Sequence, residues 1–192
     1  MTMWVFGYGS LLWNPGFPVA ERAVATLDGY HRSFCMRSIH HRGTPEEPGL
    51  VLALDAAADS ACTGLALRVE PGHEDRTLAY LRERELISSA YLERIVRLRV
   101  DATGAEIEAV AYVIDADHVQ YCGGLPLEEQ ADIIARAIGG MGPNAEYLFN
   151  TARHLEEIGL ADADLQWLAD RVAALQPQPL ADLPGDDRVK DV

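Results

Sequence analysis

Residues 50–69 read LVLALDAAADSACTGLALRV. Residues 50–54 are continuously apolar, which is typical of a strand covered on both faces. Residues 63–69 form a second apolar run, and the small and acidic residues at positions 55–60 between the two runs predict a turn. The two runs are therefore expected to be neighbouring strands near the centre of a sheet.

Shorter stretches before this one also read as strands. Residues 4–6 form an apolar run that stops at Gly7. Residues 24–27 are separated from residues 30–38 by Asp28-Gly29, a pattern that predicts a β-hairpin. The beginning of the chain is thus expected to supply strands and no long helix.

The rest of the chain reads mainly as helices. Residues 74–84 have a helical pattern, and two more strands follow at residues 92–100 and 106–114. Three helices come last, at residues 127–138, 144–158 and 162–175. Because regular β-α-β alternation is missing, we predict an α+β fold with a mostly antiparallel sheet. One domain is expected over residues 1–175, followed by an acidic, proline-containing tail at residues 176–192.

Charge and cysteine content exclude several classes of protein. The chain has 16 lysines and arginines against 30 aspartates and glutamates, and its formal net charge of −14 disfavours nucleic acid and anionic membranes as partners. Its three cysteines, Cys35, Cys62 and Cys122, contain no C-x-x-C pair, so no disulfide framework or zinc site is indicated. The sequence shows no signal peptide and no run near the ~18 apolar residues of a membrane span. We therefore expect a cytoplasmic protein.

Motifs for a bound cofactor or metal are missing from the sequence. The loop Gly7-Tyr8-Gly9-Ser10-Leu11-Leu12 begins like a dinucleotide fingerprint, but Leu12 replaces its third glycine and Pro15 leaves no room for the helix that would follow. The same loop lacks the glycines that a nucleophile elbow needs around Ser10. The histidines form no H-x-x-x-H or H-E-x-x-H pair. No cofactor and no metal are expected.

The glycine loop allows two interpretations. Gly7 and Gly9 can take positive φ and expose successive backbone N–H groups, which would make an anion-binding cradle at the end of a strand. The alternative is a tight turn with no binding role. The residues of the loop do not decide between them.

Glu85 is the carboxylate that the helical pattern singles out. At about 100° per residue, it lies seven positions after Leu78 and roughly 20° from it on the helical wheel, whereas Glu83 points about 140° away. Glu85 therefore continues the buried face, where desolvation and the helix dipole disfavour a carboxylate that has no function. The alternative is a helix that frays before Glu85 and leaves the side chain in solvent.

Two further segments each allow a binding role or a structural one. Residues 41–45 form a rigid loop that contains Arg42, and residues 144–148 open a helix with polar and aromatic groups that include Tyr147. Each segment can bind a small anion, or can cap a helix or stiffen a loop. Arg42 and Tyr147 are therefore candidates for holding a carboxylate.

Five segments, in the same order, resemble the ChaC family of γ-glutamylcyclotransferases. They are Val5-Phe6-Gly7-Tyr8-Gly9-Ser10-Leu11-Leu12-Trp13, His41-Arg42-Gly43, Tyr80-Leu81-Arg82-Glu83-Arg84-Glu85, Leu127-Glu128-Glu129-Gln130 and Asn144-Ala145-Glu146-Tyr147-Leu148-Phe149. The resemblance spans roughly residues 3–172. It implies a mixed α+β fold on a small, mostly closed β-barrel flanked by helices, with the active site at one end of the barrel.

The resemblance also implies a function. The family cleaves glutathione, a small-molecule substrate, into 5-oxoproline and cysteinylglycine without cofactor or metal. The acid that transfers the proton closes the Tyr-Leu-x-x-Arg-Glu motif and corresponds to Glu85. The loop that holds the γ-glutamyl group corresponds to Val5, Phe6, Gly7, Tyr8, Gly9 and Ser10. The oligomeric state stays open.

Ser89 departs from the family pattern, which commonly has a glycine shortly after the catalytic glutamate. A serine there stiffens the connection and affects loop geometry and turnover more than reaction type. Two other functions fit the same residues. One is a cyclotransferase for other γ-glutamyl amino acids or amines, and the other is a protein that binds a γ-glutamyl ligand without cleaving it.

Overall fold

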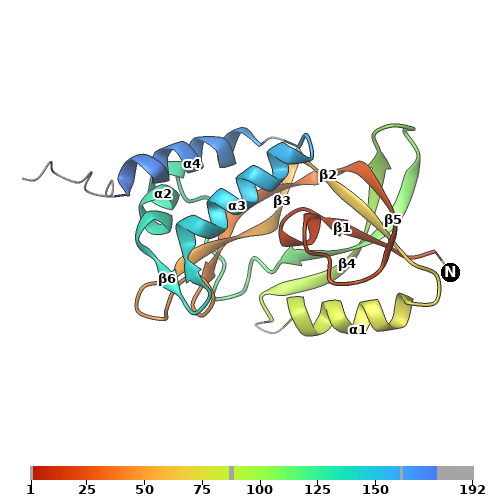
Figure 1. Cartoon of the computed structure of the whole chain (residues 1–192), viewed down its shortest axis with the longest axis horizontal. Helices are drawn as coiled ribbons and strands as arrows, with labels where there is room; N and C mark the ends of the chain where they lie inside the picture. The colour runs from red at the N-terminus through yellow and green to blue at the C-terminus, as the bar shows by residue number, and fades with distance from the viewer. Residues whose placement is uncertain (1, 87–88, 161, 177–192) are drawn as a thin grey trace, which may run out of the picture.

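The computed structural model describes residues 2–86, 89–160 and 162–176, which form a closed β-barrel and the helices around it (Figure 1). The strands are β1 (Trp4–Gly7), β2 (Val19–Ser38), β3 (Gly49–Val69), β4 (Tyr91–Val100) and β5 (Glu106–Ile114), in the spatial order β1-β3-β2-β4-β5. Neighbouring strands are antiparallel, except that β1 and β5 close the barrel in parallel at Val5 and Val110. The predicted α+β fold with a mostly antiparallel barrel is confirmed.

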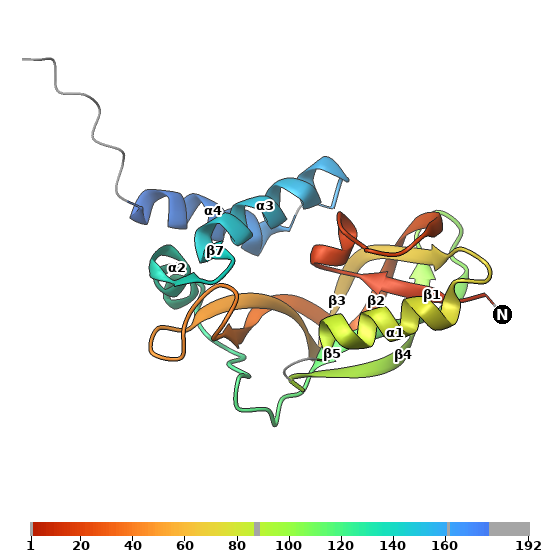
Figure 2. The same ribbon diagram turned by 60° about the horizontal axis from the view of Figure 1, so that its bottom comes forward.

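Helices flank the barrel on two sides. α1 (Glu74–Glu85) lies along one side, while α2 (Leu127–Arg136), α3 (Asn144–Glu157) and α4 (Ala163–Leu175) gather over one end of the long strands β2 and β3 (Figures 1 and 2). A 3₁₀ turn, η1 (Ser10–Leu12), follows β1, and the short strands β6 (Ile138–Gly139) and β7 (Gly142–Pro143) lead into α3. The four predicted helices are confirmed, although α2 ends at Arg136 instead of residue 138.

The predicted hairpin at residues 24–38 and the predicted turn at residues 55–60 are wrong. β2 runs without reversal through Asp28 and Gly29, and β3 runs through residues 55–60. Gly29 has a φ of 80°, and the register between the two strands shifts between Asp28 and Tyr30. At these small and polar residues the strand pairing is therefore irregular, but neither strand reverses its direction.

Apolar side chains fill the barrel and fix the helices to it. The barrel interior contains fully buried residues from four strands: Phe6, Leu54, Leu98 and Ala111. A second apolar cluster packs α2, α3 and α4 against β2 and β3. Leu81 of α1 is also fully buried and packs in a third cluster with Val5 of β1. This contact holds the last turns of α1 beside β1.

No helix within the described residues is both long enough and apolar enough to cross a membrane. Gln176, the first residue of the predicted tail, is the C-cap of α4. The remainder of that tail, residues 177–192, lies outside the described residues.

Candidate active site

A small hollow lies where β1 ends, between the loop that follows this strand and the end of α1. Its volume is about 80 Å³. The lining residues come from the loop, from three strands and from two helices: Tyr8, Gly9, Ser10, Leu11, Val51, Leu52, Glu85, Tyr91, Tyr112 and Tyr147. The loop and the carboxylate that the sequence singles out separately therefore border the same space.

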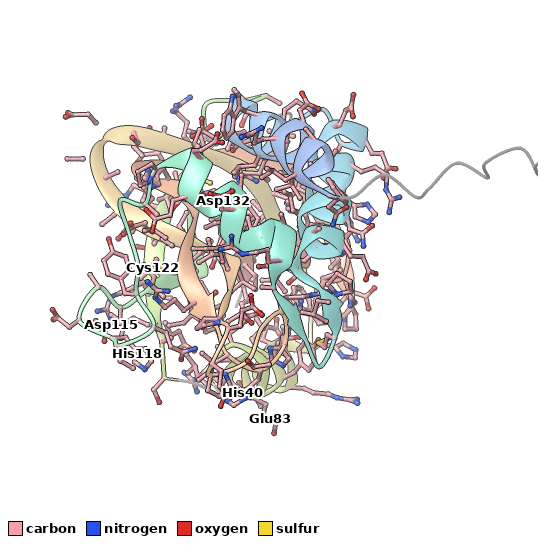
Figure 3. All side chains as sticks on the ribbon, turned by 90° about the vertical axis from the view of Figure 1, so that its left-hand side faces the viewer. His40, Glu83, Asp115, His118, Cys122 and Asp132 are labelled. Carbon is pink, nitrogen blue, oxygen red and sulfur yellow. The ribbon has the colours of Figure 1, made fainter. Side chains whose placement is uncertain are left out.

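Glu85 is the last residue of α1, and only 17% of its side chain is exposed. The helix continues through Glu85, so the alternative of a frayed helix with a solvated Glu85 is wrong. Burial raises the pKa of Glu85, and the positive charge of Arg84 partly opposes this rise. Glu83, in contrast, is exposed and points away from the molecule (Figure 3). The helical spacing thus distinguishes Glu85, which lines the hollow, from Glu83, which is exposed.

Arg84 joins the end of α1 to the loop after β1. Its Nε lies 3.1 Å from Oε1 of Glu85, and its Nη2 donates a hydrogen bond of 2.7 Å to Oγ of Ser10. Its Nη1 donates to the carbonyl of Asn14 at 2.8 Å. One guanidinium therefore fixes the carboxylate and the loop relative to each other. Ser10 is 74 residues away from Arg84, so no local sequence pattern marks this contact.

The loop does not use the backbone conformation expected from its glycines. Neither Gly7 nor Gly9 has positive φ, so that part of the cradle prediction is wrong. Gly9 is nevertheless buried, and a Cβ added to it would meet no atom within 4 Å. Gly9 also lines the hollow. Among the hydrogen bonds of residues 2–86, 89–160 and 162–176, none uses the N–H of Gly9.

The six predicted loop residues divide into two groups. Tyr8, Gly9 and Ser10 line the hollow together with Glu85. Val5, Phe6 and Gly7 belong to β1, where the side chains of Val5 and Phe6 are fully buried in separate apolar clusters. The first group faces the hollow, and the second builds the strand that positions it.

Four tyrosines surround the carboxylate of Glu85. Burial is the main cause that raises the pKa of Tyr8 and Tyr91 well above the usual value, and the pKa of Tyr147 to about 12. These hydroxyls therefore stay neutral at physiological pH. Three of the four donate to acceptors other than Glu85: Tyr8 to Tyr112 O at 2.8 Å, Tyr91 to Leu52 O at 3.1 Å and Tyr112 to Glu93 Oε2 at 3.1 Å. Nothing in the sequence pattern marked Tyr91 or Tyr112, because their parent strands β4 and β5 reach the hollow only through closure of the barrel.

Arg42 lies behind Tyr147 and does not line the hollow. Its guanidinium carbon is 5.6 Å from the centre of the Tyr147 ring, and Nη1 donates to the carbonyl of Pro143 at 3.1 Å. The same nitrogen is 3.8 Å from Oε2 of Glu146. These contacts hold the loop of residues 41–45 against the start of α3. Of the binding role and the structural role considered for Arg42, they support the structural one.

A second hollow adjoins the first at Glu85. It has a volume of about 180 Å³ and shares Val51, Glu85 and Tyr91 with the inner hollow. Its outer wall contains polar groups that include Ser38 and His40, and His40 lies at the same edge of the molecule as Glu83 (Figure 3). A hollow of about 650 Å³ between β2 and α4 is larger, but it contacts neither Glu85 nor the loop after β1. No three His, Cys, Asp or Glu side chains of the described residues come together as a metal site requires.

Ser89, just beyond the carboxylate, has a strained backbone. Its φ is 56°, and it is the only residue other than glycine with positive φ in the described part of the chain. Left-handed backbone costs an L-residue with a Cβ roughly 1–2 kcal/mol. The family pattern commonly has a glycine here, and the backbone conformation of residue 89 favours glycine as well.

We expect Ser89→Gly to raise the free energy of unfolding by about 0.5–1 kcal/mol, because relief of the strain exceeds the extra chain entropy of glycine. Urea denaturation measures this difference. Ser89→Ala keeps the Cβ and should give no gain, so an equal gain in both variants would exclude backbone strain as the cause.

Comparison with known proteins places the chain in a family. The family described as ChaC-like protein matches residues 3–175. The glutathione-specific gamma-glutamylcyclotransferase of Escherichia coli is 36% identical over 94% of this chain and 77% of its own. Gamma-glutamylcyclotransferase 2-3 of Arabidopsis thaliana is 38% identical over 90% of this chain and 89% of its own. The crystal structure of the yeast gamma-glutamyl cyclotransferase specific to glutathione, 24% identical, shares the fold with a TM-score of 0.80 over 91% of this chain and 97% of that chain.

Proposed function

Because the chain belongs to the ChaC-like protein family, we propose that it is a γ-glutamylcyclotransferase that cleaves reduced glutathione into 5-oxoproline and cysteinylglycine. Its relatives in Escherichia coli and Homo sapiens are named glutathione-specific gamma-glutamylcyclotransferases. The observation that carries the proposal is the buried carboxylate of Glu85 at the junction of two hollows, one of which is bordered by the loop after β1.

The reaction needs no nucleophile from the protein. The α-amine of the γ-glutamyl group attacks the γ-carbonyl carbon of the same group and forms the C–N bond of a five-membered ring. The amide bond to cysteine breaks, and its nitrogen leaves as the amine of cysteinylglycine. The protein must hold the folded conformer, remove a proton from the ammonium, stabilise the oxyanion and protonate the leaving nitrogen.

The site residues suit these tasks. The ammonium loses two protons on becoming the lactam N–H, and the amide nitrogen gains two on leaving as an ammonium. Glu85 takes each proton and returns it to the leaving nitrogen, so that one carboxylate acts as base and then as acid. Its raised pKa suits this exchange, because a proton carrier works best when its pKa is close to the working pH. The inner hollow receives the glutamyl arm, where N–H groups of the loop bind its oxygens. The adjoining hollow receives the cysteinylglycine part.

Incubation of the purified protein with glutathione tests this proposal. Mass spectrometry should detect 5-oxoproline and cysteinylglycine in equal amounts, with and without EDTA. If other γ-glutamyl amino acids or amines are turned over faster than glutathione in competition assays, one of them is the preferred substrate in its place. Calorimetric binding of glutathione without any product would show that the protein binds a γ-glutamyl ligand and does not cleave it.

We also propose that the enzyme is cytoplasmic, that residues 1–175 are one domain, and that nucleic acid is not a partner. Cys35, Cys62 and Cys122 are free, as is usual in a reducing compartment. The net charge of −14 opposes binding to a polyanion.

The pH dependence of the reaction should reflect the environment of Glu85. A general base must be ionised, so kcat/KM is expected to rise with pH through the pKa of Glu85, which burial places above the ordinary value of 4.5. Arg84→Met removes the positive charge that lowers this pKa, and should move the acid limb of the pH–rate profile to higher pH. Arg76→Met removes the same charge from an exposed position of α1, and should leave the limb in place.

A further inference from the structure

A buried arginine lies behind the loop that borders the active-site hollow. Arg32 belongs to β2, and only 5% of its side chain is exposed. Its Nη1 donates to the carbonyl of Tyr8 at 2.9 Å, and its Nη2 donates to the carbonyl of Thr63 at 2.6 Å. Its Nε lies 3.4 Å from Oδ2 of Asp162, the N-cap residue of α4. Arg32 does not line the hollow that contains Glu85.

The partners of Arg32 explain why an arginine is buried here. Burial of a charge is unfavourable unless it is paired and hydrogen-bonded, and of the three guanidinium nitrogens of Arg32 only Nε has no hydrogen-bond partner among the described residues. A planar guanidinium can donate to two carbonyls in a fixed geometry, which a lysine cannot do. Arg32 thereby ties the loop after β1, through Tyr8, to β3, through Thr63. The charge is therefore used to fix backbone groups.

The bond to Tyr8 determines the direction of the N–H of Gly9. The Tyr8 carbonyl and the Gly9 N–H belong to one planar trans peptide group, so they point in opposite directions. The carbonyl points to Arg32, and the N–H must point away from Arg32. Gly9 lines the hollow, so an N–H that points away from Arg32 lies beside it.

The N–H of Gly9 is also free to bind a ligand. It takes part in none of the hydrogen bonds found within the described residues, although Gly9 is buried. A buried N–H without an acceptor is unfavourable, and such groups are usually paired. The charged hydrogen bond on the carbonyl side polarises the peptide and makes its N–H a stronger donor. A site that binds substrate oxygens uses such a donor.

We propose that Arg32 is a positioning residue, which orients and polarises the Tyr8–Gly9 peptide so that the N–H of Gly9 donates to an oxygen of the γ-glutamyl group. This inference rests on the proposed function. It assigns to Arg32 an effect on catalysis that passes through Gly9, without contact between Arg32 and substrate. A purely structural Arg32 would affect stability alone.

Chemical rescue tests the proposal. We expect Arg32→Ala to lower kcat/KM for glutathione about tenfold or more, because a charged hydrogen bond behind the donor is lost. Arg32 borders two hollows of about 650 and 310 Å³, so a guanidinium ion can reach the space left by the side chain. Guanidinium chloride at a concentration below the unfolding range should restore part of the activity. Sodium chloride at the same ionic strength should not restore it.

Asp162→Asn provides the matched control. Asparagine is as good an N-cap as aspartate, so α4 keeps its cap, while the charge beside Nε of Arg32 is lost. This variant should lose stability and keep the kcat/KM of the wild type. An Asp162→Asn variant as inactive as Arg32→Ala would show that Arg32 acts only through stability, and so would Arg32→Ala with unchanged kcat/KM.

A measurement on Gly9 keeps the proposal testable if Arg32→Ala does not fold. In Glu85→Gln protein labelled with ¹⁵N-glycine, glutathione should shift the amide resonance of Gly9 more than those of glycines remote from the hollow, such as Gly104. An unchanged Gly9 resonance at saturating glutathione would overturn the proposal. Absence of 5-oxoproline from the wild type would instead overturn the proposed function, so the two failures can be told apart.

Discussion

Replacement of Glu85 by glutamine is expected to lower cysteinylglycine release from glutathione by at least about a hundredfold, since a positioned base contributes about 10²- to 10⁴-fold. Glutamine has nearly the same shape as glutamate but cannot accept the ammonium proton. The closing of the ring and the protonation of the leaving amine both depend on this proton. Measurement of product release by mass spectrometry over several hours makes a rate a hundredfold below that of the wild type detectable.

Glu83→Gln is the matched control for this variant. It makes the same chemical change two residues earlier on α1, at a side chain that is exposed and points away from the molecule (Figure 3). Its activity should equal that of the wild type. A Glu85→Gln protein that keeps more than about a tenth of the wild-type rate would contradict the role of Glu85.

Stability separates a loss of chemistry from a loss of fold. Burial raises the pKa of Glu85, so the folded protein favours the protonated carboxyl more than the unfolded chain does. The stability that the protonated form contributes is complete below the unfolded-state pKa and is lost as pH rises through the higher folded-state pKa. At neutral pH, Glu85→Gln should therefore melt at a higher temperature than the wild type, and this gain should vanish below pH 4.5. A Glu85→Gln protein that is inactive but more stable than the wild type would therefore have lost the proton carrier and kept the fold.

The features that sequence could predict depend on local periodicity. The burial of Glu85 follows from its distance of seven residues to Leu78 on one helix, and that spacing is independent of the rest of the fold. The order of strands and helices is local in the same way. Each strand or helix buries an apolar face, so the spacing of neighbouring apolar residues indicates whether a segment is a strand or a helix.

The features that sequence could not predict depend on distant partners. Asp28-Gly29 has the composition of a turn, but β2 pairs with β3 on both sides of it, and only the register shifts there. Arg84 meets Ser10 across 74 residues, and Arg32 meets Tyr8 across 24 residues. These contacts depend on how distant parts of the chain pack together, which no local pattern encodes. The general location of the site was therefore predictable, and the hydrogen bonds that hold it were not.

Asn144 is a further residue whose role depends on a distant partner and not on its neighbours in sequence. The sequence allows it to bind an anion or to cap the helix that it begins. In the structure it does neither, because Pro143 is the N-cap and the side chain of Asn144 is fully buried. Its Nδ2 donates to the carbonyl of Leu50 at 2.7 Å, and its Oδ1 accepts from the N–H of Leu50 at 2.6 Å. The amide thus pairs with β3 as a neighbouring strand would.

Asn144→Ala should therefore destabilise the protein by about 3 kcal/mol, because it leaves the buried N–H and carbonyl of Leu50 without partners, at roughly 1–3 kcal/mol each. The side chain of Asn144 is fully buried, so bulk water does not reach the two groups that it satisfies. Urea denaturation measures the loss.

Asn150→Ala removes an exposed hydrogen bond to Arg153 from the same helix, and should change the stability by less than about 0.5 kcal/mol. Asn144 also begins the helix that carries Tyr147 into the hollow, one turn later. We therefore expect Asn144→Ala to lose activity even at temperatures where it stays folded. An Asn144→Ala protein with wild-type stability would show that α3 is held by apolar packing alone, and that the contact between Asn144 and Leu50 does not position Tyr147.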